Sequence, residues 1–345
     1  MGELVDVCSG RDYKHLSEGD IPVYGTGGYM LSVSEALSYD KDAIGIGRKG
    51  TIDKPYILNA PFWTVDTLFY AIPKEKVDLN FAFDIFQNIN WKKKDESTGV
   101  PSLSRTAINE IHILVPQYDE QQVLGQLFYG IDRLIALHQR KLDKMKELKK
   151  AFLNLIFSQK LRFYGFTDSW ELRKFESIAA RASSISADPT LPRVEYEDII
   201  SGIGLLNKDV KLKGISKPGI VFNQGDILYG KLRPYLHNWF LPSFSGLAVG
   251  DFWVLQPKDA DSSFLFRLIQ GQQFDDVANQ SIGTKMPRAD WNLVSKTLFF
   301  VPTSIDEQAL IGRYFRSIDN LITLYQKKID SSKEMKKILL KNMLI

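Results

Sequence analysis

The most chemically suggestive motif in the sequence is the glycine-rich segment Gly45–Gly50, which matches the G-x-G-x-x-G pattern of dinucleotide-binding turns. Such a turn must lead directly into a helix whose first amide groups bind the pyrophosphate. Instead, the segment Thr51–Pro55 follows, and Pro55 would interrupt a helix in its first turns. We therefore interpret the glycines as a turn close to another backbone, with Arg48 and Lys49 placed to meet a phosphate group.

Other enzyme chemistries lack their residues. Cys8 is the single cysteine, and the four histidines, His15, His112, His138 and His237, have no metal-ligand spacing. The sequence contains no G-x-x-x-x-G-K-[ST] nucleotide loop, no G-x-S-x-G elbow and no Asn-Pro-Pro or Asp-Pro-Pro core of an amino-methyltransferase. We expect no catalytic residue and no metal site. The many carboxylates leave a metal-dependent nuclease as an open alternative.

Cations, amides and aromatic side chains in loops suit contact with DNA. Sequence is read at base edges, and phosphates are held by Lys, Arg and small polar groups. For every candidate, an ordinary solvated surface residue is the alternative. The candidates in the first half of the chain are Arg48, Lys49, Lys54, Ser102, Ser104 and Arg105, with Lys92 and Lys93 from a run of three lysines. Those in the second half are Lys231, Arg233, Tyr235, His237, Asn238, Lys285 and Arg288.

An internal repeat assigns these loops to two similar modules. Ile113–Pro116 is followed by Asp-Glu-Gln at 119–121, and Phe299–Pro302 is followed by Asp-Glu-Gln at 306–308. From there the two copies match at a constant offset of 187 residues. The matched pairs include Gly125 with Gly312, Asp132 with Asp319, Lys146 with Lys333, Lys150 with Lys337 and Leu153 with Leu340.

The apolar segments Ile113–Pro116 and Phe299–Pro302 are expected to be strands that end at their prolines, because proline cannot continue a sheet. A long helix is expected after each strand, because the aspartate that follows can cap it. Apolar residues then recur in steps of three and four, which is typical of a narrow coiled-coil seam. We expect the two helices to pack on each other as an antiparallel coiled coil; the alternative is that each packs on its own module. The predicted packing residues are Leu127, Ile131, Leu134, Met145, Leu148, Phe152, Ile318, Leu321, Tyr325, Ile329, Met335 and Leu339.

The charge distribution separates the helices from the modules. Residues 125–162 carry nine cations against three acids, and residues 312–345 carry eight against three. The formal net charge of the whole chain is only +3, so the remaining residues are net acidic. DNA contacts by the modules must therefore come from local patches, whereas the basic helices could face DNA phosphates or acidic partner surfaces.

The chain resembles the specificity subunit of type I restriction–modification systems. The motifs that carry the resemblance are the two Val-Pro…Asp-Glu-Gln segments, the Gly-Asp-Ile-Leu strand at 225–228, the Gly-Thr-Lys-Met-Pro-Arg loop at 283–288 and the Trp-Glu-Leu opening at 170–172. One departure is that nothing equivalent to Phe163–Trp170 precedes Leu4. This leaves open whether the N-terminus is shortened or the family's lead-in is absent.

The resemblance implies an α+β fold with two pseudo-repeated target recognition domains. The expected division is a recognition domain at 1–118, a helix at 119–162, a second recognition domain at 163–304 and a second helix at 305–345. Each domain would read one half of a bipartite, asymmetric site in double-stranded DNA. The helices would set the spacing of the halves.

The resemblance also implies partners that perform the chemistry. Two methyltransferase subunits would dock on the helices and use S-adenosylmethionine, and nuclease/translocase subunits would use ATP and Mg²⁺. The N-terminus has no signal-peptide pattern and no apolar run is long enough to span a bilayer, so we expect a cytoplasmic protein. The rival hypotheses are a coiled-coil scaffold that does not read DNA and a stand-alone DNA-modifying enzyme.

Overall fold

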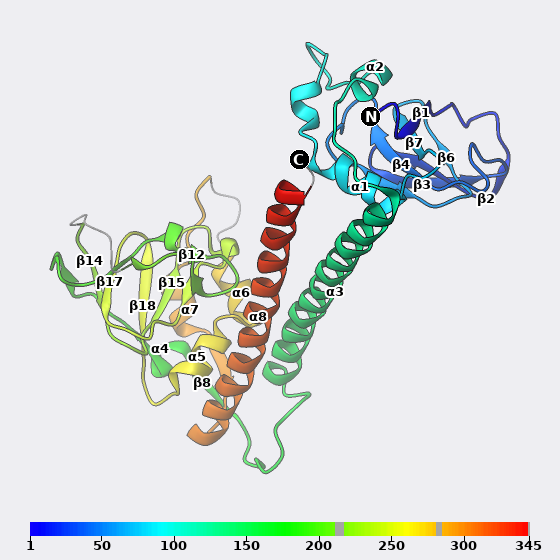
Figure 1. Ribbon diagram of the computed structural model, residues 1–345. Helices are drawn as coiled ribbons and strands as arrows, with labels where there is room; N and C mark the ends of the chain where they lie inside the picture. The colour runs from blue at the N-terminus through cyan, green and yellow to red at the C-terminus, as the bar shows by residue number, and fades with distance from the viewer. Residues whose placement is uncertain (211–216, 281–284, 344–345) are drawn as a thin grey trace. The chain divides into compact units, whose positions relative to one another are not determined.

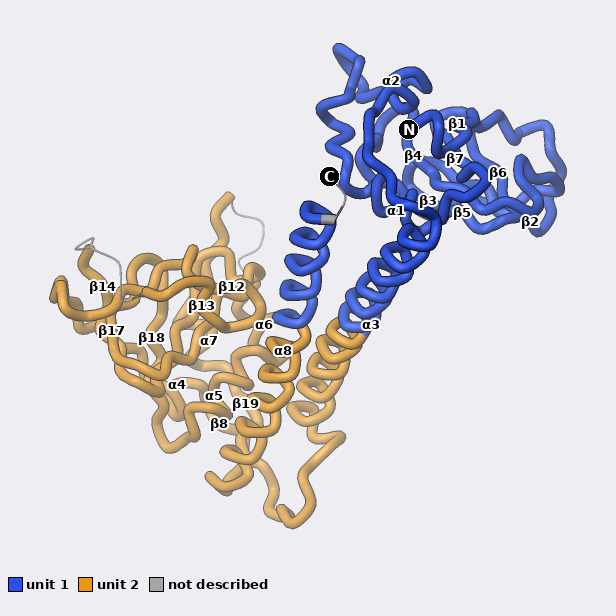
Figure 2. Tube along the Cα trace, in the orientation of Figure 1, with its two compact units in different colours: residues 1–140, 326–345 blue, residues 141–325 orange. Residues whose placement is uncertain are grey.

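A computed structural model of the chain describes residues 1–210, 217–280 and 285–343, so Gly283 and Thr284 of the expected loop lie outside the described residues. Helices and strands are mixed, which confirms the expected α+β class (Figure 1). The chain divides into two compact units, residues 1–140 with 326–345 (unit 1) and residues 141–325 (unit 2) (Figure 2). Each unit takes a portion of both long helices. The finer predicted boundaries between modules and helices stay a prediction.

Unit 1 is built on an antiparallel four-stranded sheet in the order β1-β7-β4-β5. Its core lies on both faces, because Ile44 and Ile46 pack with helix α1 (Leu79–Asn88) on one face while Ala43 and Leu58 pack with Phe62 on the other. A second sheet has the order β3-β2-β6. The strands are β1 Val5–Ser9, β2 Glu18–Gly25, β3 Gly28–Val33, β4 Ala43–Gly47, β5 Tyr56–Leu58, β6 Trp63–Thr64 and β7 Leu68–Pro73.

Unit 2 has a corresponding antiparallel sheet in the order β16-β15-β18-β9, and a second four-stranded sheet in the order β10-β14-β17-β11. Two further strand pairs, β12-β13 and β19-β8, complete it. The strands are β8 Glu171–Lys174, β9 Ala179–Arg181, β10 Ile185–Ser186, β11 Arg193–Val194, β12 Ile199–Ile200, β13 Leu205–Leu206, β14 Gly219–Phe222, β15 Ile227–Gly230, β16 Trp239–Phe240, β17 Gly246–Ala248, β18 Phe252–Pro257 and β19 Leu298–Val301.

The helices of the two modules are short, and two helices are long. Unit 1 contains α1 Leu79–Asn88, η1 Trp91–Lys94 and α2 Arg105–Asn109, and unit 2 contains α4 Phe175–Ile178, η2 Tyr196–Asp198, η4 Pro234–Leu236, α5 Ser262–Leu268, α6 Gln272–Ala278 and α7 Trp291–Lys296. The long helices are α3 Tyr118–Phe157 and α8 Ile305–Met343 (Figure 1). No helix among the described residues is long and apolar enough to cross a membrane.

The repeat is visible in the structure. Gly47 at the end of β4 lies opposite Leu68 of β7, and Gly230 at the end of β15 lies opposite Phe252 of β18. The following helices also begin alike, because the Asp78 carboxylate accepts the amide of Phe81 in α1 and the Asp261 carboxylate accepts the amide of Phe264 in α5.

Within unit 2, the two long helices run antiparallel. Lys141, Lys149 and Phe152 of α3 contact Tyr325, Asp319 and Tyr314 of α8 respectively, so the partner number falls as the α3 number rises. In unit 1 the same helices meet at the ion pair between Asp132 and Lys336. Supercoiling of the pair stays a prediction.

The predicted helix-packing residues were partly wrong. Ile131, Met145, Phe152, Ile318, Tyr325, Ile329 and Leu339 are buried or half-buried, but Leu127, Leu134, Leu148, Leu321 and Met335 are between 36% and 58% exposed. The buried side of the helices instead includes Leu124, Phe128, Leu142, Leu153, Ile311, Phe315, Ile322 and Leu340. Each helix carries two apolar stripes at similar spacing, and the sequence pattern alone did not separate them.

Candidate nucleic-acid interface

In unit 1, the ends of neighbouring strands bring several cations to one edge of the main sheet. β1 ends with Ser9 opposite Phe69, and β4 ends with Gly47 opposite Leu68. Arg48 follows β4 directly, and Arg105 donates a hydrogen bond to the Ser9 hydroxyl at 2.8 Å. Both arginines are exposed, as a contact with DNA phosphate requires, and the Arg48 guanidinium lies 5.7 Å from the centre of the Phe69 ring.

A pair of loops at this edge is joined by backbone hydrogen bonds. The amide of Arg48 donates to the carbonyl of Thr67 at 2.8 Å, and the amide of Leu103 donates to the carbonyl of Arg48 at 2.9 Å. The amide of Gly50 donates to the carbonyl of Pro101 at 2.8 Å, and Lys49 forms a β-bridge with Ser102. The two loops selected from the sequence in the first module therefore lie side by side.

Unit 2 forms the same loop pair with different side chains. The amide of Lys231 donates to the carbonyl of Asp251 at 2.9 Å, and the amide of Arg233 donates to the carbonyl of Pro287 at 2.8 Å. The amide of Ala289 donates to the carbonyl of Lys231 at 2.8 Å. Leu232 forms a β-bridge with Arg288, as Lys49 does with Ser102 in unit 1. These bonds align Thr67 with Asp251, since their carbonyls accept the amides of the equivalent residues Arg48 and Lys231.

Asp251 organises the cations of the second loop pair. Its carboxylate lies 3.0 Å from Arg288 and 3.5 Å from Lys231. Burial opposes the charge of Asp251, but the hydrogen bond and charge of Arg288, assisted by Lys231, outweigh burial and lower the pKa of the carboxyl group. The two cations are thereby fixed at the loop edge, where a phosphate could compete for them.

Several other candidates are held by the protein itself. Asn238 is 6% exposed and accepts a hydrogen bond from Ser201 at 2.7 Å, so its burial argues against the predicted DNA contact. The Ser104 hydroxyl caps α2 by accepting the amide of Ala107. Lys92 forms an ion pair with Asp53 at 2.9 Å, and its hydrogen bond lowers the pKa of the Asp53 carboxyl group.

The remaining candidates lie on the surface. His237 Nε2 lies 2.9 Å from Asp275, and its ring stacks on Trp239. Tyr235 is 47% exposed. Lys54, Lys93 and Lys285 are exposed as well, and within the described part of the chain no contact brings them into either loop pair.

Arg11 is a candidate that the sequence analysis missed. It follows β1, its amide donates to the carbonyl of Thr64 at 2.8 Å, and its side chain is exposed. Burial raises the pKa of Tyr70, and the charges of Arg11 and Arg105 oppose that rise, so both cations lie near this ring. The available signal was a cation close after the first strand, with Gly10 between Ser9 and Arg11, comparable to Arg48 after β4.

The repeated Asp-Glu-Gln motif forms a joint between module and helix. The Gln121 side chain donates to the carbonyl of Pro116 at 3.0 Å and accepts the amide of Asp78 at 3.2 Å. In unit 2 the Gln308 side chain makes the same two bonds, to Pro302 at 2.8 Å and from Asp261 at 2.8 Å. Both glutamines are buried, so each long helix is attached to the cap of its module's helix.

Buried charged residues also connect the long helices to the short helix of each module, and the short helix contributes an acid in unit 1 but a base in unit 2. In unit 1 the Lys336 ammonium lies 2.6 Å from Asp132 and 3.7 Å from Asp84 of α1. In unit 2 the Asp319 carboxylate lies 2.8 Å from Lys149 and 2.6 Å from Arg267 of α5. Asp84 and Arg267 each stand six residues after their helix cap, so the repeat exchanges an acid for a base at one position.

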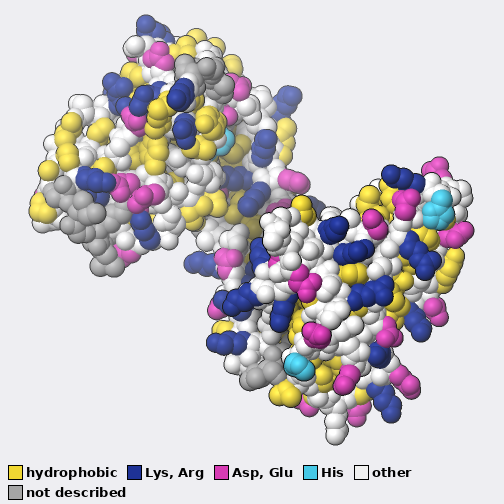
Figure 3. All heavy atoms as spheres, turned by 90° about the horizontal axis from the view of Figure 1, so that it is seen from above, with side chains coloured by type: hydrophobic (Ala, Val, Ile, Leu, Met, Phe, Trp, Pro, Cys, Tyr) yellow, Lys and Arg dark blue, Asp and Glu magenta, His cyan; other side chains and the backbone are white. Residues whose placement is uncertain are grey.

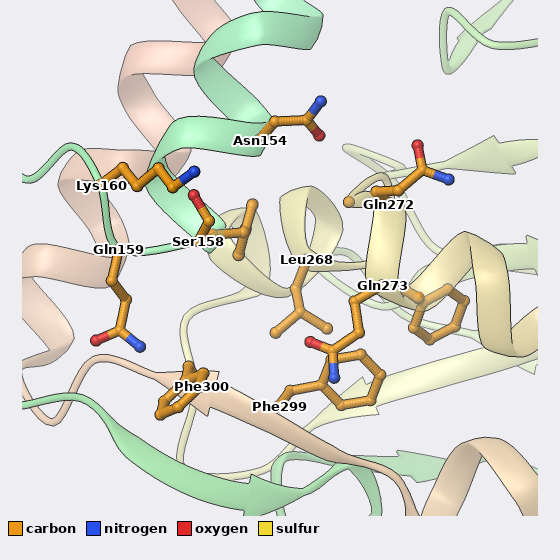
Figure 4. Close-up of a pocket in the computed structure, with 12 residues that line it drawn as sticks. Asn154, Ser158, Gln159, Lys160, Leu268, Gln272, Gln273, Phe299 and Phe300 are labelled. Carbon is orange, nitrogen blue, oxygen red and sulfur yellow. The ribbon is translucent and has the colours of Figure 1, made fainter.

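Two hollows in unit 2 lie apart from the loop pair. One, of about 480 Å³, is lined by Asn154 and Ser158 near the end of α3 together with Gln273, Phe299 and Phe300 (Figure 4). The other, of about 510 Å³, includes His237 and Trp239. Neither contains Lys231, Arg233 or Arg288, and the described residues include no group of three His, Cys, Asp or Glu that could hold a metal ion.

Acidic and basic side chains are interspersed over both units on the face drawn in Figure 3. No broad basic field is visible on that face, in keeping with the net acidic charge of the modules. The loop pairs are therefore local cationic features, and specificity would depend on few side chains.

Comparisons with known proteins point in the same direction. Residues 1–147 match a family model described as the type I restriction modification DNA specificity domain. The chain is 21% identical over 277 residues to the type I restriction enzyme MjaVIII specificity subunit of Methanocaldococcus jannaschii, covering 71% of this chain and 64% of that protein. This chain thus spans less than two thirds of that relative's length. The chain is also 20% identical over 358 residues to the type I restriction enzyme EcoDI specificity subunit of Escherichia coli, and the match covers 91% of this chain and 79% of that protein.

Solved structures share the fold. The S subunit of a type I restriction–modification system from M. genitalium matches with a TM-score of 0.71 and 13% identity, over 100% of this chain and 94% of that one. A chain from a structural study of complex assembly in the type I R-M system matches with a TM-score of 0.53 and 12% identity, over 99% and 95%.

Proposed function

We propose that this chain, whose residues 1–147 belong to the type I restriction modification DNA specificity family, is the non-catalytic specificity subunit of a type I restriction–modification complex. Each unit reads one half of a bipartite, asymmetric DNA site. The observation that carries the proposal is the repeated loop pair, at 48–50 with 101–103 and at 231–233 with 287–289. The backbone bonds are kept while the side chains differ, as expected of two readers that recognise different bases.

In this proposal the long helices bind two methyltransferase subunits. Exposed apolar residues support this part, because Leu134 matches Leu321 and Leu148 matches Met335 at the 187-residue offset. Each unit thus presents an equivalent pair, and a repeated apolar surface suits two copies of one partner. S-adenosylmethionine would bind to the methyltransferase, and ATP with Mg²⁺ to nuclease/translocase subunits, in the cytoplasm.

Module exchange tests the reading of DNA. Residues 163–304 are replaced by the equivalent module of another specificity subunit, and the complete system is expressed in cells. Sequencing of methylated adenines should then show one half-site changed and the other retained. A change in both halves, or in neither, would refute the modular proposal.

Partner docking is tested separately with Leu134→Glu in unit 1. Ala136→Glu is the matched control, because Ala136 is also exposed but lies about 200° around the helix from Leu134. Copurification of the methyltransferase subunit with the full chain should fall for Leu134→Glu and stay unchanged for Ala136→Glu. Equal recovery with both variants would place the docking surface elsewhere.

A further inference from the structure

Gly50 and Arg233 occupy the same position of the repeated loop pair. Their amides donate to the equivalent carbonyls of Pro101 and Pro287, both at 2.8 Å. Both residues have left-handed backbones, with φ of +88° at Gly50 and +50° at Arg233. The loop therefore requires a positive φ at this position in each module.

Glycine meets this requirement at little cost, whereas arginine does not. A side chain on a left-handed residue crowds the backbone, and a following proline further restricts the residue before it. Arg233 has both disadvantages, because Pro234 comes next. A Cβ built on Gly50 would meet no atom within 4 Å, so packing around this position does not call for a side chain. The arginine at 233 is thus a local cost without a gain in packing.

The surroundings of Arg233 explain what its side chain can do. The neighbouring cations Lys231 and Arg288 are held by Asp251, and Arg233 is exposed on the same loop pair, opposite Pro287. No described residue forms an ion pair or side-chain hydrogen bond with Arg233 in the structure. A guanidinium group offers a planar set of donors that matches the O6 and N7 acceptors of guanine in the major groove.

We infer that Arg233 reads a guanine edge for the second module, and that the strained backbone is kept for this contact. Gly50 leaves the equivalent position of the first module without a reader. The inference rests on the proposed function, because it requires that the loop pair faces DNA.

The test compares Arg233→Gly, Arg233→Lys and the control Asp259→Gly in the complete cognate system. Asp259 is another exposed left-handed residue of unit 2, with φ of +43°, in the turn between β18 and α5. Methylated-adenine motifs are sequenced, the affinity for a duplex carrying the wild-type motif is measured, and melting temperatures of the full chain are recorded.

Arg233→Gly should melt at the same or a higher temperature, yet lose one specified base pair of one half-site. Its affinity for the wild-type duplex should fall about 10- to 100-fold, the range for a lost bidentate base contact. Arg233→Lys should lose the same base pair, since an ammonium group does not make the bidentate contact. Asp259→Gly should leave the motif intact.

Three results would overturn the inference. They are an unchanged motif in Arg233→Gly, full recovery of specificity in Arg233→Lys, which would indicate a phosphate contact, and a lower melting temperature for Arg233→Gly. Failure of the proposed function is distinguishable, because the wild-type system would then methylate no bipartite motif.

Discussion

The Nζ of Lys336 lies 2.6 Å from the Oδ2 of Asp132, although 204 residues separate them in the sequence. The same pair recurs in unit 2 between Lys149 and Asp319 at 2.8 Å, and both partners are shifted by 187 residues. Each unit therefore joins the beginning of one long helix to the end of the other through a duplicated ion pair. Both lysines are largely buried, which makes the pairs sensitive to loss of either partner.

Asp132→Asn should lower the free energy of unfolding by about 2–4 kcal/mol, because it removes the nearest carboxylate from the buried Lys336 and leaves the Gln87 side-chain oxygen and the more distant Asp84. Urea denaturation of the full chain measures the change. Glu334→Gln, an exposed acid on α8, is the control and should change stability by less than about 0.5 kcal/mol. Equal effects of the two substitutions would show that the pair contributes nothing.

Arg267 and Asp319 should show strong energetic coupling. The Arg267 guanidinium is 4% exposed and lies 2.6 Å from Asp319, and burial lowers its pKa in opposition to that carboxylate. A double-mutant cycle with Arg267→Ala and Asp319→Ala should give a coupling free energy of about 1–3 kcal/mol. Additive effects would contradict a direct interaction.

Asp84 should make unit 1 less stable as the pH rises. Burial raises the pKa of its carboxyl group to about 8, and Lys336 only partly opposes this. Because an unfolded aspartate titrates near pH 4, the folded chain holds an extra proton between about pH 4 and pH 8, and stability falls through that range. Between pH 5 and pH 8.5, the free energy of unfolding of Asp84→Asn should therefore fall by about 1–3 kcal/mol less than that of the wild type. Parallel stability profiles would contradict a protonated Asp84.

Gly312→Ala should destabilise the chain strongly. A Cβ at Gly312 would lie 1.8 Å from the Ser263 Oγ and 2.9 Å from its backbone carbon, so α5 would have to move away from α8. Gly130→Ala is the matched control, since a Cβ at Gly130 on α3 meets no atom within 4 Å. We expect a loss of about 2–3 kcal/mol for the first and a gain of about 0.5–1 kcal/mol for the second, from helix propensity. Thermal unfolding of both variants checks the contrast.

Much of the architecture could be predicted from the sequence because the same pattern of residues occurs in both halves of the chain. The Val-Pro…Asp-Glu-Gln segments indicated two long helices, which α3 and α8 confirm, and the polar loops around Arg48 and Arg233 were identified as candidate contacts. The strand expected before each helix is present only in the second copy, as β19, and the prediction was wrong for residues 113–116, which form no strand. The pattern did not identify the buried stripe, since Leu134 and Leu148 repeat along α3 as regularly as Phe128 and Leu142.

The joining of the loops depends on long-range backbone bonds that a local pattern does not contain. The bond from Arg233 to Pro287 connects residues 54 positions apart. The left-handed backbone of Arg233 was equally invisible, because arginine before proline is not a sequence signal for positive φ. The burial of Asn238, which argues against it as a candidate, was equally absent from the local pattern, as was its hydrogen bond with Ser201, 37 positions away.

The glutamine joint has a consequence for how new specificities can arise. Gln121 and Gln308 bind only a backbone carbonyl and a backbone amide in their modules, so they require no particular side chain from the reading surface. Recombination that replaces the loops but preserves a capped helix and the terminal proline would therefore preserve the hydrogen bonds between module and long helix. Inheritance of the attachment and inheritance of the target sequence are in this way physically separable.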